Sequence, residues 1–216
     1  VANVMLVLGT AAMLGACSEP EMGIKKDAIA VILASIILLI TVMLGEISTL
    51  IGAMMLISLI LYYIYSYNYS KKLGLDEELE ETWIGENIPL AIMVTIFGGF
   101  LIFLGAEFLI EGSIGIADEM GISETIVGLS VIALGTSLPE LAVTVIAAVR
   151  GHKGVAIGNV LGSNVINILG ILGVSSVYAG GILISEEFAG RDIWVVMATS
   201  GLVAAMLLDN RRIGKR

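Results

Sequence analysis

One carboxylate beside a proline, inside an apolar segment, constrains this chain more than any other feature. Glu140 follows Pro139 in the sequence GTSLPE, and the residues on both sides, including 141–149, are mostly apolar. An apolar segment of roughly 20 residues is long enough to cross a bilayer as a helix. A carboxylate inside such a helix is costly, so we interpret Glu140 as a functional residue.

Pro139 predicts a break in this helix. Proline has no backbone N–H, and its ring clashes with the carbonyl four residues earlier, here that of Gly135. Broken backbone at membrane depth is tolerated only where it is buried or lines a wet cavity. We expect backbone and side-chain oxygens to become available from Ala133, Thr136, Ser137 and Glu140. Oxygen ligands suit hard cations such as sodium, calcium or magnesium.

A second apolar segment, GNVLGSNVIN, carries a polar stripe. Its members are each four positions apart, which places them on one helix face: Asn159, Ser163 and Asn167. Gly158 and Gly162 have the same spacing, which lets another helix come close. The stripe is therefore expected to face the Glu140 helix. The alternative, that these groups only join helices by hydrogen bonds, stays open for Asn159 and Asn164.

The two motifs together resemble the second α-repeat of the cation/calcium exchanger superfamily, and they look most like the prokaryotic sodium/calcium exchangers. The resemblance implies that Glu140 binds calcium and sodium. It also implies ligands from Ala133, Thr136, Ser137, Ser163 and Asn167. In potassium-dependent relatives an Asp in this helix is linked to potassium, so Asn167 argues against potassium dependence.

The resemblance also implies the fold: an all-α polytopic membrane protein with inverted repeats of five helices each. About seven of the ten family helices are expected here. The first two and the last helices of the same polypeptide are expected to be missing, which makes the chain a fragment. A composition of 57% hydrophobic and 14% charged residues agrees with a membrane protein.

An internal repeat supports this interpretation. Residues 1–9 align without gaps on residues 165–173, with Asn3 on Asn167 and Gly9 on Gly173. Internal repeats are common in transporters, and this one adds Asn3 to the candidate metal ligands. It predicts that the chain starts within a helix. A lipoprotein signal ending at Cys17 is the competing interpretation of this segment.

The apolar segments predict spans at 1–16, 28–44, 47–67, 88–112, 125–149, 155–179 and 193–208. Residues 1–69 would end the first repeat, 70–87 would be an acidic cytoplasmic linker, and 88–216 would form the second repeat without its last span. Residues 114–123 are expected to be a short external loop. The linker could alternatively sense calcium, although it lacks EF-hand spacing. Tyrosines near residue 65 predict an aromatic belt at the interface.

Charge predicts the orientation. Of the 11 Lys and Arg residues, all except Arg191 fall in loops 17–27, 70–87, 150–153 and 209–216. The positive-inside rule makes these loops cytoplasmic in a cell inner (plasma) membrane. The alternation of spans then places the two repeat copies in opposite directions, as alternating access requires.

These features predict a secondary antiporter that exchanges calcium for sodium at a midplane, all-oxygen site. We expect no enzymatic activity and no cofactor. The expected partners are the transported calcium and sodium ions and the lipid bilayer, with no nucleic acid. A proton/calcium antiporter on the same fold is the nearest alternative, and a cation channel is a third. An intramembrane hydrolase would need Ser137 and the single histidine, His152, which are far apart along the helix repeat.

Overall fold

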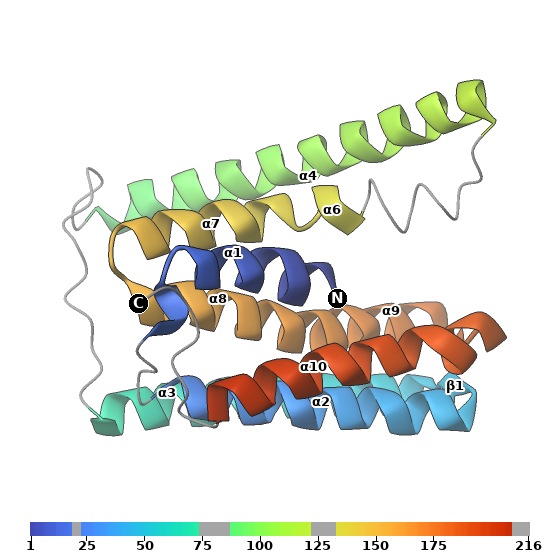
Figure 1. Cartoon of the computed structure of the whole chain (residues 1–216). Helices are drawn as coiled ribbons and strands as arrows, with labels where there is room; N and C mark the ends of the chain where they lie inside the picture. The colour runs from blue at the N-terminus through green and yellow to red at the C-terminus, as the bar shows by residue number, and fades with distance from the viewer. Residues whose placement is uncertain (19–22, 74–86, 122–132, 209–216) are drawn as a thin grey trace. The chain divides into compact units, whose positions relative to one another are not determined.

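A computed structural model describes residues 1–18, 23–73, 87–121 and 133–208 (Figure 1). The chain divides into two compact units, which we describe separately. Unit 1 combines Val1–Leu75 with Pro139–Arg216, and unit 2 is Asp76–Leu138. Most of the predicted linker, residues 74–86, lies outside the described residues, as do 122–132 and 209–216.

Unit 1 is built around one long helix in three parts, α8 (Lys153–Val165), η4 (Ile166–Ile171) and α9 (Leu172–Ala179). α2 (Ile24–Leu44) packs on α8 and on α10 (Ile193–Leu208), while α3 (Thr49–Leu73) packs on η4 and α9 (Figure 1). Three short N-terminal helices, η1 (Asn3–Leu8), α1 (Gly9–Met13) and η2 (Ala16–Ser18), complete the core with α7 (Leu138–Val149). η5 (Phe188–Asp192) leads into α10.

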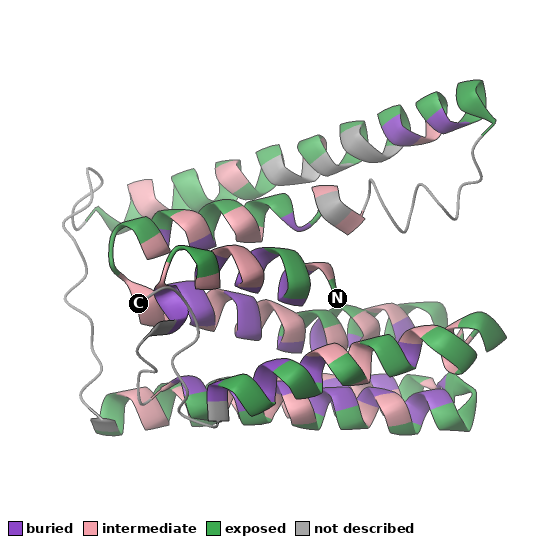
Figure 2. Ribbon diagram, in the orientation of Figure 1, coloured by how far each residue is buried: buried purple, intermediate pink, exposed green. Residues whose placement is uncertain are grey.

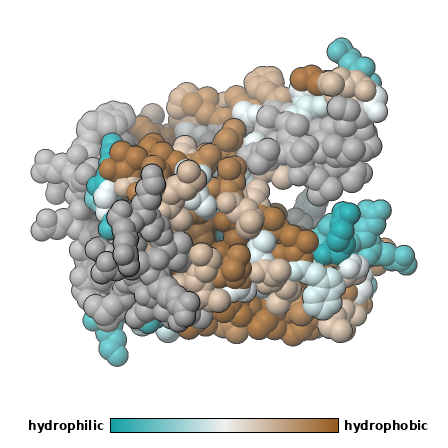
Figure 3. Space-filling view, viewed as in Figure 1, coloured by the Kyte–Doolittle hydropathy of each residue, from teal (hydrophilic) through white to brown (hydrophobic). Residues whose placement is uncertain are grey.

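The core of unit 1 lies along α8, where Ile157, Val160 and Leu161 are fully buried (Figure 2). The outward face of α2 is apolar as well. Its exposed residues recur at helical spacing: Ile29, Leu33, Ile36 and Ile40. Hydrophobic residues also cover much of the coloured surface in Figure 3. An apolar stripe on the outside of a helix is costly in water and is typical of a helix that faces lipid.

The all-α membrane fold is confirmed. Within the described ranges, four helices are long and apolar enough to cross a membrane: Ile24–Leu44, Thr49–Lys72, Lys153–Ala179 and Phe188–Leu207. The other three predicted spans coincide with shorter apolar helices at Asn3–Met13, Ile88–Leu101 and Leu138–Val149.

Unit 2 contains α4 (Ile88–Met120) and α6 (Ala133–Gly135). Asn87 caps α4, because its side-chain oxygen accepts a hydrogen bond from the backbone N–H of Leu90 at 3.2 Å. The helix ends at Gly121, whose left-handed φ of +64° suits a C-cap. The prediction of an external loop at 114–123 was therefore wrong for residues 114–120. A fall in hydropathy marks where a span leaves the membrane. It does not mark where the helix ends, because the helix continues until a residue such as Gly121 terminates it.

Two other boundaries also differ, since α2 begins at Ile24 and α3 continues to Leu73. Both extensions add polar turns to apolar helices. The connections after α2 and after α9 meet in a small antiparallel pair that the sequence did not predict, β1 (Glu46–Ile47) with β2 (Ile182–Leu183). Ser176 strengthens this junction by donating a hydrogen bond to the Ile47 carbonyl at 2.7 Å. These two connections were predicted to share one side of the membrane.

The internal repeat has a structural counterpart. η1 and η4 are both π-helices, and they contain the aligned residues Asn3 and Asn167. π-helices are rare and frequently occur at functional sites. Their appearance at matching positions supports the alignment of residues 1–9 on 165–173.

A close approach of α3 and α9 yields a stability prediction. A Cβ on Gly52 would lie 2.9 Å from both the carbonyl oxygen of Gly173 and the Cβ of Ser176. Gly52→Ala should therefore destabilise the protein by about 1–3 kcal/mol through overpacking. Gly201→Ala is the matched control, because a Cβ there meets no described atom within 4 Å. Thermal unfolding in detergent checks this, and equal unfolding temperatures for the two variants would contradict it.

Candidate cation site

The helix breaks where Pro139 predicted it. α6 ends at Gly135 and α7 begins at Leu138, so Thr136 and Ser137 lie in a turn between them. Proline in the first turn of a helix needs no N–H partner, which explains why α7 starts here. The Ser137 hydroxyl donates to the Ala133 carbonyl at 3.0 Å, and that of Thr136 donates to the same carbonyl at 3.3 Å. A hydroxyl that donates a hydrogen bond can also accept one or bind a cation through its oxygen. Ala133, Thr136 and Ser137 belong to unit 2.

Glu140 lies in the first turn of α7, where a helix N-terminus favours negative charge. Its carboxylate lines a cavity of about 410 Å³ within unit 1. One wall of this cavity comes from α7 and the α8–η4 helix, with Glu140, Gly158, Asn159, Gly162, Ser163 and Ile166. The other wall comes from α2 and α3, with Asp27, Tyr62, Tyr63 and Ser66.

The predicted ligand Ser163 meets the other repeat copy. The side-chain amide of Asn3 donates to the Ser163 hydroxyl at 3.1 Å, and Ser163 in turn donates to the Val160 carbonyl at 2.9 Å. Asn3 is only 6% exposed. The sequence alignment that selected Asn3 thus identified a residue in direct contact with the polar stripe.

Two buried oxygens stand out because they lack partners. In the part of the chain that the structure describes, Glu140 Oε2 and Asn3 Oδ1 are the buried side-chain polar atoms without a hydrogen bond. An unsatisfied buried polar atom costs about 1–3 kcal/mol, and more when it is charged. Both atoms belong to residues predicted as metal ligands. A bound cation would supply the missing interaction for each.

The rest of the polar stripe behaves differently. Asn159 donates to the Glu140 carbonyl at 3.2 Å and to the Thr144 hydroxyl at 3.1 Å, so it ties α8 to α7. Asn164 donates to the carbonyl of Val160 in its own helix at 2.8 Å. For Asn159 the alternative of a hydrogen bond between helices accounts for the side chain, whereas this hydrogen bond of Asn164 joins no second helix.

Asn167 does not line the cavity of unit 1 and is exposed. The four-residue spacing assumed an α-helix, but η4 begins at Ile166 and uses wider, i→i+5 turns, for which that spacing does not apply. Its role as a ligand stays a prediction. Gly158 and Gly162 also differ from expectation: no described backbone packs on them, and they widen the cavity instead.

The sequence analysis did not predict that residues of α2 and α3 line this cavity. Tyr62 was assigned to an interfacial aromatic belt, yet it is partly buried and its hydroxyl donates to Asp27 at 2.8 Å. Tyr65 and Tyr67 are exposed, as a belt requires. The available sequence signal for this part of the cavity was an acidic residue in the first turn of an apolar helix. Acidic residues are also common at that position for another reason, because they interact favourably with the helix N-terminus.

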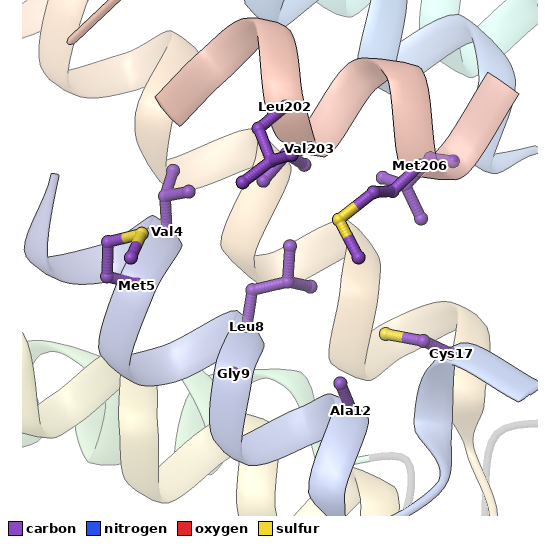
Figure 4. A pocket seen from close by; sticks show the side chains of 10 residues that line it. Val4, Met5, Leu8, Gly9, Ala12, Cys17, Leu202, Val203 and Met206 are labelled. Atoms are coloured by element: carbon purple, nitrogen blue, oxygen red, sulfur yellow. The ribbon is translucent and has the colours of Figure 1, made fainter. Parts of the chain in front are cut away.

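A second cavity, of about 170 Å³, is apolar and does not fit a cation. Figure 4 shows its side chains between η1–α1 and α10, with Val4, Leu8 and Val203 among them. Cys17 also lines it, and burial raises the pKa of this thiol to about 11, so it stays protonated at neutral pH. Among the described residues, no three His, Cys, Asp or Glu side chains group to hold a metal ion. The polar cavity beside Glu140 is the better candidate.

A mostly helical membrane protein with a broken helix, and with a carboxylate oxygen that lacks a described partner on a cavity lined by several polar side chains, fits the class of ion transporters. Comparison with known proteins agrees. The model of the family described as sodium/calcium exchanger protein matches residues 90–214. This chain belongs to the sodium/calcium exchanger family, and its fold class is that of a membrane cation exchanger.

Three relatives illustrate the similarity. The protein CaxA of Alkalimonas amylolytica is 32% identical over 100% of this chain and 68% of its own length. The sodium/calcium exchanger MaX1 of Methanosarcina acetivorans is 49% identical over 36% of this chain and 22% of its own. The solved sodium/calcium exchanger from Methanococcus jannaschii is 28% identical, with a TM-score of 0.66, over 94% of this chain and 63% of that one. The chain thus spans about two thirds of CaxA and of the solved exchanger.

The Asn159 bridge yields a second prediction. Asn159→Ala removes both hydrogen bonds between α8 and α7, and interhelical hydrogen bonds in membranes contribute about 0.6–2 kcal/mol each. We expect a lower unfolding temperature in detergent. Asn164→Ala is the control, because its hydrogen bond stays within α8. An Asn159 variant as stable as the Asn164 variant would show that the bridge does not hold α7.

Proposed function

We propose that this chain forms part of the ion pathway of a secondary antiporter that exchanges calcium for sodium. The observation that carries the proposal is the pair of buried, unpartnered oxygens, Glu140 Oε2 and Asn3 Oδ1. Membership of the sodium/calcium exchanger family supports the same conclusion. A cation would interact favourably with both oxygens, and no described side chain forms a hydrogen bond with either of them.

The ligand set suits a hard cation. Glu140, Ser163 and Asn3 come from unit 1, while Ala133, Thr136 and Ser137 come from unit 2. Asn167 is the remaining candidate. Calcium takes about six to eight oxygen ligands, and sodium also prefers oxygen. We propose that further helices of the same polypeptide, the expected first two and last, complete this shell.

Charge couples the two ions. Glu140 can neutralise part of a calcium charge or bind sodium, so the two ions compete for one carboxylate. Moving an empty carboxylate through the bilayer is costly, whereas an occupied one is neutralised. Occupied states can therefore switch between the two sides of the membrane, and empty states are held back. This is the behaviour that exchange without leak requires.

Glu140→Gln tests the site. The change keeps the shape but removes the charge, so sodium-gradient-driven calcium uptake into vesicles with the complete protein should fall to background. Glu187→Gln removes an exposed carboxylate before α10 and should leave uptake unchanged. Normal uptake by the Glu140 variant would refute the assignment.

The driving ion separates the alternatives. Calcium uptake should follow an imposed sodium gradient and should be insensitive to a pH gradient. Uptake driven by the pH gradient alone would instead identify a proton/calcium antiporter. Calcium flux that does not saturate and needs no counter-ion would identify a channel. No stimulation by potassium is expected, given Asn167.

Sidedness is a separate proposal. The distribution of Lys and Arg places loops 17–27, 70–87, 150–153 and 209–216 in the cytoplasm, with the protein in the cell inner membrane. The start of α2 is joined to the second half of α3 by hydrogen bonds from Tyr62 to Asp27 and from Lys26 to Ser66, as expected if loops 17–27 and 70–87 share one side.

A further inference from the structure

We propose that Asp27 and Tyr62 form a second cation-binding station on the cavity that Glu140 lines, and that Lys26 occupies this station when no metal ion is bound. The station rests on the proposed function and deepens it, since its residues line the same cavity as Glu140. It takes a hard mono- or divalent cation.

The shared cavity is the first observation. Asp27, Tyr62 and Ser66 line the same cavity as Glu140 and Ser163. All five residues belong to unit 1, so one compact body holds both carboxylates. Two carboxylates facing one cavity concentrate cations in it.

The contacts of Asp27 are the second observation. Its Oδ1 accepts hydrogen bonds from the Tyr62 hydroxyl at 2.8 Å and from the Lys26 ammonium at 2.9 Å. Lys26 also donates to the Ser66 hydroxyl and lies 6.0 Å from the centre of the Tyr69 ring. The ammonium therefore has the oxygen partners, a carboxylate and a hydroxyl, that a sodium or calcium ion would take.

The burial of this pair needs an explanation beyond stability. The side chains of Lys26 and Asp27 are only 9% and 14% exposed. Removing two charges from water costs about as much as their attraction returns, so a buried ion pair is weak evidence for a stabilising role. Lys26 has a flexible stem at the first turn of α2, which allows its ammonium to leave when a metal ion arrives.

A purely structural role makes a different prediction. Asp27 would then serve only to favour the N-terminus of α2. Its loss would alter stability and leave cation binding unchanged. A station requires instead that Asp27 increases cation affinity and that Lys26 decreases it.

Terbium binding tests the station without transport. Terbium replaces calcium at oxygen sites, and it emits when a neighbouring tyrosine is excited. In the complete, purified protein carrying Glu140→Gln, we expect saturable tyrosine-sensitised emission. Adding Asp27→Asn should abolish the saturable component, and adding Lys26→Gln should strengthen terbium binding by roughly three- to tenfold, as expected for removing one competing charge.

Matched controls lie on the same helices. Lys25→Gln removes an exposed neighbouring charge and should leave terbium affinity unchanged. Tyr62→Phe should weaken the sensitised emission, whereas Tyr67→Phe, which alters an exposed residue, should not. Emission that survives Asp27→Asn, or a Lys26→Gln variant with unchanged affinity, overturns the station. Thermal unfolding of each variant identifies any that fail to fold, and Asp27→Asn is the milder change because it keeps an acceptor for Tyr62.

Transport separates this proposal from the proposed function. In vesicles, Asp27→Asn should raise the half-saturating calcium concentration on the side of loops 17–27 and leave the opposite side unchanged. Equal changes on both sides would overturn the station while the exchanger stands. Terbium binding at Asp27 in a protein with no sodium-driven calcium flux would retain the station as a cation site and refute the exchanger.

Discussion

The cost of leaving a carboxylate oxygen unpaired inside a membrane protein governs the structure around Glu140. In water such a group is always solvated, but between helices it must find a partner. Here the first turn of α7 carries the group, and Asn159, Gly162 and Ser163 of α8 line the same cavity. Within the described residues, the local fold supplies a favourable helix end, and Glu140 Oε2 has no hydrogen-bond partner. An incoming cation is the natural partner.

The sequence predicted much of this arrangement because the relevant signals are local. Pro139 determines the helix break through the chemistry of its own backbone, and it does so in any context. Repeat alignment added Asn3 to the candidate ligands without any knowledge of packing, and the structure places Asn3 in contact with Ser163 of the polar stripe. Hydropathy located the spans, although α4 continued past its apolar part to Gly121.

The remaining features depend on tertiary structure, which local patterns do not contain. Asp27 and Tyr62 reach the Glu140 cavity only because α2 and α3 pack against the α8–η4–α9 helix. Asn167 lies in the π-helix η4, where the four-residue spacing of an α-helix does not apply. The ligand roles of Ala133, Thr136, Ser137 and Asn167 remain predictions, as does the division into repeats.

The Asn159 bridge has a mechanical consequence. Asn159 donates hydrogen bonds to both the Glu140 carbonyl and the Thr144 hydroxyl. Because these bonds link α7 to α8, we expect the two segments to move together. Because the bridge holds the backbone of Glu140 itself, a displacement of α8 would carry the carboxylate proposed to bind the ion with it.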